Sequence, residues 1–406
     1  MQDTLFTGQP VFCQLLSLIP RGMIETLAHK TQANRYYKKF KARDHLVTML
    51  FTAFTGCRSL REVTTGLQAW SSRLVHLGLK YAPPRSTLAD ANEQRPVAFF
   101  RDLFRELYWR YYGRLPDSRS KRRQMERLFL MDSTTIQLFQ DIMKAAGSSP
   151  ANGKRKGGVK AHVLINAQED VPRLVLMTPS SKNDKRLMKH VELPKGSILV
   201  FDRAYAHFKQ WEIWGKEGIY WVTRANDNFI FELKEDRPIS KKERQLGVTK
   251  DEIGILGRAT GPDSVKIKVR RVHYTDPKTG KAFVFLTNHQ RFNPSKIALF
   301  YQKRWQIELL FKRLKQNYPL RYFLGDNENA IRIQIWCSLI CDLLVKIIQD
   351  KVTRRKWSYS NLASIIRLHL GNYFDLAKFL DNPDKAKAWL KTKPPDNKDP
   401  VLFPSL

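Results

Sequence analysis

Residues 159–179, VKAHVLINAQEDVPRLVLMTP, contain the two neighbouring apolar runs that indicate the fold most directly. The short polar turn QED separates them, and this pattern predicts a β-hairpin. Apolar runs also flank the hairpin, RLFLMD before it and SILVFD after it, and each stops at an acid, Asp132 or Asp202. Residues 182–193 and 204–215 have helical spacing, and YWVTRA at 220–225 is strand-like. The order strand, hairpin, helix, strand, helix, strand predicts an α/β core.

The segments around this core have different patterns. Residues 1–115 show helical spacing throughout, as in FFRDLFRELYWRYYGRL. There, YAPPRS places Ser86 at a helix N-cap position; a short helix starting there could enter a DNA groove or simply connect two helices. In residues 225–290, NFIFEL, SVKIKVRRVHY and KAFVFLTN are strand-like, and DPKTGK is a turn, which predicts a β-rich insertion.

The charge of the chain indicates its partner. Lys and Arg number 71 against 38 Asp and Glu, a formal net charge of +33. An enzyme of small metabolites has no need of this excess, whereas a nucleic acid accounts for it. Membrane attachment is the rival explanation, but the basic residues are spread along the whole chain instead of forming one amphipathic segment.

Cysteine use and hydropathy predict a soluble protein of the reducing cytoplasm. The start, MQDTLFTGQP, lacks the basic region and apolar run of a signal peptide. The most apolar stretch, IWCSLICDLLVKII, is too short to cross a bilayer and contains Asp342 and Lys346. The four cysteines form no CxxC pair and no disulfide framework.

A strongly helical segment at residues 300–316, FYQKRWQIELLFKRLKQ, holds one glutamate among many cations. On a helix of 3.6 residues per turn, Arg304, Glu308 and Lys315 fall within roughly 60° of Tyr301. This polar sector borders an apolar arc about 120° wide, formed by Leu299, Ile307, Leu310, Phe311 and Leu314. Glu308 could therefore line a cleft wall; the alternative is a solvated face with ion pairs along the helix.

Two apolar runs that end in Asp132 and Asp202, with Glu308 on a later helix, are typical of a site for two divalent metals. Hard oxygen ligands favour Mg²⁺ or Mn²⁺ over zinc, and cleavage of phosphodiesters suits such a pair. Either aspartate alone could instead be a turn or cap residue. A glycosidase with paired carboxylates is a further alternative, but it leaves the charge of the chain unexplained.

Tyr301, Arg304, Glu308 and Lys315 fit the signature Y-(2)-R-(3)-E-(6)-K without a gap. With MDSTT around Asp132 and FDRAY around Asp202, the chain resembles the insertion sequence four family of bacterial DDE transposases. FKARDHLVTMLFTAFTGCRSLREV, from residue 40 on, also resembles a leader domain found in that family. The resemblance extends from about residue 35 to residue 345.

The resemblance implies a ribonuclease-H-like catalytic core with a β-rich insertion. The expected parts are a helical DNA-binding domain at 1–115, the core at 116–224 and 291–350, the insertion at 225–290, and a helical region with a polar tail at 351–406. It also implies that Asp132, Asp202 and Glu308 hold two Mg²⁺ ions, for which Mn²⁺ substitutes. Tyr301, Arg304 and Lys315 would grip the DNA backbone.

Further expectations concern DNA contacts and assembly. Other candidate DNA-binding residues are Lys154, Arg155 and Lys156 in a Gly-flanked loop, and Arg203 beside the second aspartate. The partners implied are double-stranded DNA, as transposon terminal repeats and target, and a second copy of the chain, since two ends must be paired.

The reaction implied is cut-and-paste transposition, with one departure from the family pattern. Better-known members form a DNA hairpin and hold a flipped base against a tryptophan of the insertion, but this chain has no Trp between Trp221 and Trp305. The aromatic residues left there, such as Phe229, Phe283 and Phe285, could substitute or could pack the core. A ribonuclease-H-fold nuclease or resolvase without strand transfer, and a silent DNA-binding descendant, are the alternative functions.

Overall fold

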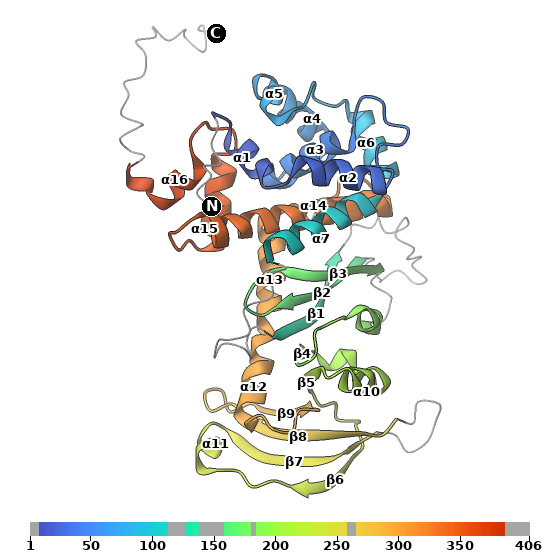
Figure 1. Ribbon diagram of the computed structural model, residues 1–406, viewed down its shortest axis with the longest axis vertical. Helices are drawn as coiled ribbons and strands as arrows, with labels where there is room; N and C mark the ends of the chain where they lie inside the picture. The colour runs from blue at the N-terminus through green and yellow to red at the C-terminus, as the bar shows by residue number, and fades with distance from the viewer. Residues whose placement is uncertain are drawn as a thin grey trace, which may run out of the picture. The chain divides into compact units, whose positions relative to one another are not determined.

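The computed structural model describes residues 8–112, 127–137, 158–179, 184–257, 265–320 and 322–385 (Figure 1). The chain divides into two compact units, one made of residues 1–91 with 337–406 and the other of residues 92–336. The first unit is therefore built from both ends of the chain, whereas the second is continuous.

The first unit is helical. Its elements are α1 (Val11–Ser17), α2 (Arg21–Lys30), α3 (Ala42–Thr55), α4 (Leu60–Ala69), η1 (Ser71–Arg73), α5 (Leu74–Leu77), η4 (Ile348–Val352), α15 (Tyr359–Leu368) and α16 (Leu376–Asp381). Helices α6 (Arg85–Gln94) and α14 (Glu328–Ile347) each span a division between the units. The core of this unit includes the rings of Phe12, Phe51 and Trp70, and the Phe12 amide donates to the Leu370 carbonyl at 2.9 Å.

The expected N-cap at Ser86 is wrong by two residues. Helix α6 begins at Arg85, because the Pro84 carbonyl already accepts the Leu88 amide at 3.0 Å. Proline is tolerated at a helix start since the missing N–H has no partner there in any case. Ser86 therefore lies inside the first turn.

The second unit is built on one sheet of nine strands in the order β3-β2-β1-β4-β5-β9-β8-β7-β6. The strands are β1 (Leu128–Gln137), β2 (Gly158–Asn166), β3 (Pro172–Pro179), β4 (Ile198–Phe201), β5 (Tyr220–Arg224), β6 (Phe231–Asp236), β7 (Val248–Leu256), β8 (Ile267–Thr275) and β9 (Ala282–Thr287). Strands β1, β4 and β5 are parallel, and the other pairings are antiparallel. The fold is therefore mixed α/β with a large sheet.

The structure tests two local expectations, one for a hairpin and one for a helix. The predicted hairpin is confirmed, because β2 and β3 pair antiparallel from Val159 opposite Pro179 to Ile165 opposite Pro172. The stretch expected to be helical after it forms a 3₁₀ helix, η2 (Asp184–His190), instead of an α-helix. Strands β6 to β9 extend the sheet outward from β5, so the segment expected to form a β-rich insertion belongs to the same sheet as β1 to β5.

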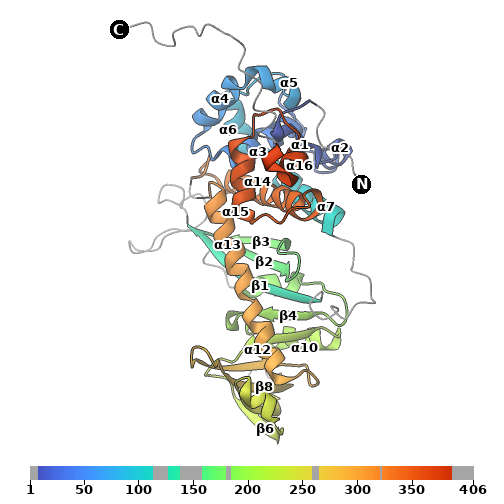
Figure 2. The same ribbon diagram turned by 90° about the vertical axis from the view of Figure 1, so that its left-hand side faces the viewer.

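Helices lie on both faces of the sheet (Figure 2). Helix α10 (Phe208–Lys216) covers one face, where Trp211 and Trp214 pack with Met131 and Phe201. Helices α12 (Pro294–Lys303) and α13 (Trp305–Asn317) run across the other face. The remaining helices described in this unit are α7 (Val97–Tyr112), η3 (Arg203–Tyr205) and the short α11 (Lys241–Gln245).

Helices α12 and α13 are not one regular helix. At the junction, the Arg304 amide bonds to the Tyr301 carbonyl and the Ile307 amide to the Arg304 carbonyl, three residues back instead of four. Leu299 is therefore 47% exposed, although a single regular helix would have placed it on the apolar arc. The other four residues predicted for that arc are buried in α13.

Candidate active site

Strand register places the two aspartates side by side. Met131 of β1 pairs with Phe201 of the parallel strand β4, so Asp132 and Asp202 follow at the same level of neighbouring strands. Successive side chains of a strand point to opposite faces. Met131 and Phe201 pack with Trp211 and Trp214 of α10, whereas Asp132 and Asp202 lie on the other side, against Arg304 and Tyr301.

The expectation that the first strand stops at Asp132 is wrong. Strand β1 continues to Gln137, and Asp132 lies opposite Val163 in the middle of the pairing with β2. The run loses its apolar character there because Asp132, Ser133 and Thr134 are only partly buried, on the side where the site opens. By contrast, β4 does end at Phe201, immediately before Asp202.

Arg304 joins the strands to the helix. Its guanidinium donates to the Asp132 carboxylate and, at 2.9 Å, to Oε1 of Glu308. The Tyr301 hydroxyl lies 3.4 Å from Oδ2 of Asp202. The structure therefore brings together both aspartates, the glutamate, Tyr301 and Arg304, which lie in β1, directly after β4, in α12, in α13 and at the junction of the two helices.

The pKa values reflect this crowding of charges. The pKa of Asp132 is raised to about 6, chiefly by burial and also by the carboxylates of Asp202 and Glu308, against the opposing effect of Arg304. Burial alone would lower the pKa of Arg304, but Asp132 and its neighbours raise it. Burial lowers the pKa of Lys315. The three acids are thus close enough to influence one another electrostatically.

A cleft of about 560 Å³ opens beside Asp132 and Glu308. Lys312 and Lys315 line it, and Nζ of Lys315 donates to the Thr134 hydroxyl at 2.9 Å. Lys312 was missed by the sequence reasoning, although its position four residues after Glu308 on the helix could have indicated it. The cleft combines carboxylates at one end with two ammonium groups, which suits a phosphodiester.

The other candidate DNA-binding residues lie elsewhere. Arg203 follows Asp202 in the chain, but its side chain lines a separate pocket of about 490 Å³ with Phe208 and Phe229. Lys154, Arg155 and Lys156 lie outside the described residues. Of the aromatic side chains considered for the insertion, Phe285 is buried, and Phe229 packs against the core.

The donor set fits divalent metal ions, although the acids are not gathered as a metal cage. Among the residues that the structure describes, no three His, Cys, Asp or Glu side chains form a metal-binding group. Instead, the Arg304 guanidinium supplies positive charge to Asp132 and Glu308. Carboxylate oxygens are the ligands that Mg²⁺ and Mn²⁺ prefer, so the residues present are chemically suited to these ions.

In the described parts of the chain, no single helix is long and apolar enough to cross a bilayer. Helices α1 and α2 together have the length and composition of a span, but they are bent by 62° relative to each other.

Family models match two parts of the chain. One, described as a transposase DDE domain, matches residues 123–344, and another, a domain of unknown function, matches residues 7–80. The first range contains Asp132, Asp202 and Glu308 and covers more than half of the chain.

Several relatives are transposases by name. A putative transposase of Sinorhizobium fredii is 32% identical over 266 residues, covering 66% of this chain and 72% of the relative. A putative insertion sequence transposase of Synechocystis is 26% identical over 277 residues, covering 65% and 71%. A probable insertion sequence transposase of Geobacillus stearothermophilus is 25% identical over 241 residues, covering 59% and 61%.

One solved structure, a piggyBac transposase synaptic complex with hairpin DNA, aligns over 98% of this chain and 89% of its own. Its TM-score is 0.39 at 11% identity, too low to carry an argument. The family match over residues 123–344 and the Sinorhizobium relative are sufficient: the chain belongs to the transposase DDE domain family.

Proposed function

We propose that Asp132, Asp202 and Glu308 are the catalytic carboxylates of a ribonuclease-H-like core that cuts and rejoins DNA with two divalent ions, Mg²⁺ or Mn²⁺. One observation carries the proposal: Arg304 binds Asp132 and Glu308 together, and Asp202 is near enough to raise the pKa of Asp132. Three acids from separate elements crowd together at an energetic cost that catalysis explains better than packing.

When bound, the ions would activate water or a 3′-hydroxyl and stabilise the departing oxygen. The residues of the chain have their own parts. Strands β1 and β4 give Asp132 and Asp202 a rigid base, which accurate positioning requires. Lys312 and Lys315 hold a phosphate in the cleft, and Arg304 turns from the carboxylates to the DNA backbone when the site is occupied.

The proposed substrate is double-stranded DNA, namely the ends of an insertion sequence and a target. The named relatives from Synechocystis and Geobacillus are transposases for such elements, which supports this assignment. The net charge of +33 fits a polyanion. A homodimer follows from the need to pair two ends, and the proposed route is cleavage followed by transfer of the 3′-hydroxyl.

The test is cleavage of a DNA end by variants of the three acids. Asp132→Ala, Asp202→Ala and Glu308→Ala should each lose at least about 10³-fold in rate while end binding stays within a few-fold of wild type. Glu212→Ala is the matched control, because in the part of the chain that the structure describes this acid of α10 pairs along its own helix with Lys216. Metal-dependent cutting by the Glu308 variant at the wild-type rate would contradict the assignment.

A nuclease that does not join strands is the alternative, and the same preparation separates it. Pre-cleaved ends with free 3′-hydroxyls are mixed with supercoiled target DNA. Joined products, lost in the Asp132 variant, support transposition; cleavage without joining supports the nuclease.

A further inference from the structure

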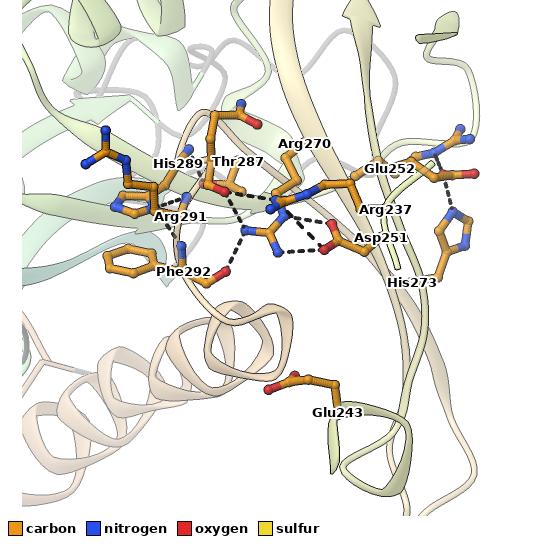
Figure 3. Close-up of polar contacts among 12 residues, drawn as sticks. Arg237, Glu243, Asp251, Glu252, Arg270, His273, Thr287, His289, Arg291 and Phe292 are labelled. Carbon is orange, nitrogen blue, oxygen red and sulfur yellow. Dashed lines mark hydrogen bonds and ion pairs between the residues drawn. The ribbon is translucent and has the colours of Figure 1, made fainter. Parts of the chain in front are cut away.

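The loop at residues 288–293 connects the insertion to α12. A buried arginine of the insertion, Arg270, is hydrogen-bonded to this loop. Arg270 of β8 is 1% exposed. Its Nε and Nη2 each donate to the Asp251 carboxylate at 2.7 Å, and its Nη1 donates to the Phe292 carbonyl at 2.6 Å. Figure 3 shows Arg270 between Asp251 and Phe292, above the start of the helix. Arg270 thus ties two strands to the loop.

The backbone of the loop is fixed from within as well. Nδ1 of His289 accepts hydrogen bonds from the backbone amides of Arg291 and Phe292 at 3.1 and 3.0 Å. The rings of His289 and Phe292 also stack, with centroids 3.3 Å apart. Burial, helped by Arg270, lowers the pKa of His289 to about 4, so the ring stays neutral and keeps accepting these bonds.

A second contact from the insertion holds the first turn of α12. Oε2 of Glu243, from α11 of the insertion, accepts the Ser295 amide at 2.8 Å. This amide is one of the first in α12 and has no partner within the helix. The residue in the N-cap position, Asn293, makes no side-chain cap bond. A carboxylate from another element therefore caps the helix and complements its dipole.

Helix α12 contains Tyr301 and leads directly to Arg304 and Glu308. Phe292 packs on Phe300, and Phe285 of β9 packs on Tyr301, with ring centroids 5.4 and 5.0 Å apart. Tyr301 lies in α12, Arg304 at the junction and Glu308 in the first turn of α13. A shift at the start of α12 is therefore passed along α12 and across its junction with α13 to Glu308.

We propose that Arg270, Asp251 and Glu243 are positioning residues for the reaction: they clamp the start of α12 so that Glu308 and Arg304 face Asp132 and Asp202. This inference rests on the proposed function of the three acids. It gives the insertion a task that needs no contact with DNA. The clamp acts through the backbone carbonyls and amides of the loop and helix, not through the reacting atoms.

The obvious objection is that a buried ion pair only stabilises the fold. Replacement of both partners by apolar residues answers it, because such replacements are often neutral or stabilising. The variant Arg270→Met/Asp251→Leu keeps the core filled but removes the donor to the Phe292 carbonyl. A structural role then predicts wild-type cleavage, whereas a positioning role predicts slow cleavage by a stable protein.

The neighbouring residues offer a matched control. Arg271 and Glu252 pair on the same two strands, one position along, and Arg271 lies over the Phe231 ring instead of the loop. Arg271→Met/Glu252→Leu therefore removes an ion pair from β7 and β8 and leaves the clamp in place. Glu243→Ala is a second test variant, which removes only the cap on Ser295.

Four quantities are measured on the full chain: thermal unfolding, affinity for a DNA end, single-turnover cleavage with its Mn²⁺ dependence, and hydrogen exchange of the amides at 289–300. The Arg270/Asp251 variant should unfold no earlier than wild type and bind DNA within about threefold. Its cleavage should be on the order of 10- to 100-fold slower. Half-maximal cleavage should need several-fold more Mn²⁺, and exchange at 289–300 should be faster.

The outcomes separate the two levels of inference. Wild-type cleavage by both the Arg270/Asp251 and Glu243→Ala variants, or equal losses in the test and control pairs, would overturn the clamp. If the Arg270/Asp251 protein does not fold, Glu243→Ala decides alone. Cleavage that survives Asp132→Ala and Glu308→Ala would instead overturn the proposed function.

Discussion

Asp132 is held in a charged state at a cost. Its carboxylate is largely buried, with side-chain exposure of 16%, and lies near two further acids. The Arg304 guanidinium offsets part of this cost. Proteins often keep such unfavourable groups where a ligand later compensates them, and stability is given up for function.

The pH dependence of stability should reveal this cost. Because the native state raises the pKa of Asp132 from 3.8 to about 6, it binds the proton more tightly than the unfolded chain does. The stabilising effect of the proton is full below pH 4 and is lost as the pH rises through 6. At pH 7.5, metal-free Asp132→Asn should exceed wild type by up to about 3 kcal/mol in unfolding free energy.

Urea unfolding at pH 4 and 7.5 measures this difference. The two proteins should be about equally stable at pH 4, and Glu212→Gln should follow wild type at both values. An Asn variant less stable than wild type at pH 7.5 would show that the carboxylate is a net stabiliser.

Arg304 bonds to the carboxylate oxygens of Asp132 and Glu308 that would hold the proposed metal ions. Charge-assisted hydrogen bonds contribute about 1.5–3 kcal/mol each, so Arg304→Ala should bind Mn²⁺ roughly tenfold more tightly in the absence of DNA. Calorimetric titration of the DNA-free protein measures the affinity. Lys312→Ala removes a nearby charge that lines the same cleft and serves as control; equal gains in both variants would indicate only a general field effect.

At the scale of elements, Arg313 ties helix α13 to the turn of the hairpin. Arg313 of α13 pairs with the Asp170 carboxylate and donates to the Asp170 carbonyl at 3.0 Å. Asp170, in the turn between β2 and β3, has a φ of +52°, a conformation that few residue types adopt readily. Turn and helix therefore support each other beside the site.

Loss of this contact should destabilise the catalytic unit. Arg313→Met keeps most of the side-chain packing but removes the donors, so we expect a loss of about 1–3 kcal/mol. Guanidinium unfolding measures it. Lys312→Met changes the preceding, exposed position and should cost less than about 0.5 kcal/mol. A similar loss in both variants would mean that the Asp170 contact is not the cause.

Elements with a simple hydrophobic pattern could be predicted from the sequence, and those that depend on distant partners could not. The hairpin and β4 follow from apolar runs bounded by turn residues. Strand β7, VTKDEIGIL, was not foreseen because Asp251 and Glu252 look like surface residues. They are buried, at 3% and 5% exposure, since Arg270 and Arg271 of the next strand pair with them. Similarly, nothing local indicates that β1 continues past Asp132.

The sequence predicted part of the candidate site, namely its acids, Tyr301 and Arg304, but it did not predict their arrangement. Spacing along one helix grouped Tyr301, Arg304 and Glu308. That Arg304 bonds the carboxylates instead of remaining available to DNA depends on the strand facing it. Strand register, which aligns Asp132 with Asp202, is a property of the folded sheet.

At the scale of the molecule, the charge of +33 should dominate the affinity for DNA. Binding that neutralises six to ten phosphates weakens by roughly 10³- to 10⁵-fold between 50 and 200 mM salt. Lys312→Ala and Lys315→Ala should each lower the slope of log affinity against log salt by about one. Fluorescence anisotropy with a cleavage-deficient Asp132→Asn background measures this; unchanged slopes would place the phosphates outside the cleft.

The helical unit is formed by two segments that lie on either side of residues 92–336, and this affects the order of folding during synthesis. Its helices α1 to α5 are made before residues 92–336, whereas Leu370 and Phe374, the partners of Phe12 and Gln14, are made after them. At about 5–20 residues per second, those partners arrive tens of seconds later. The continuous unit at 92–336 can fold in the interval, whereas the helical unit is completed only after residues 370–374 have been made.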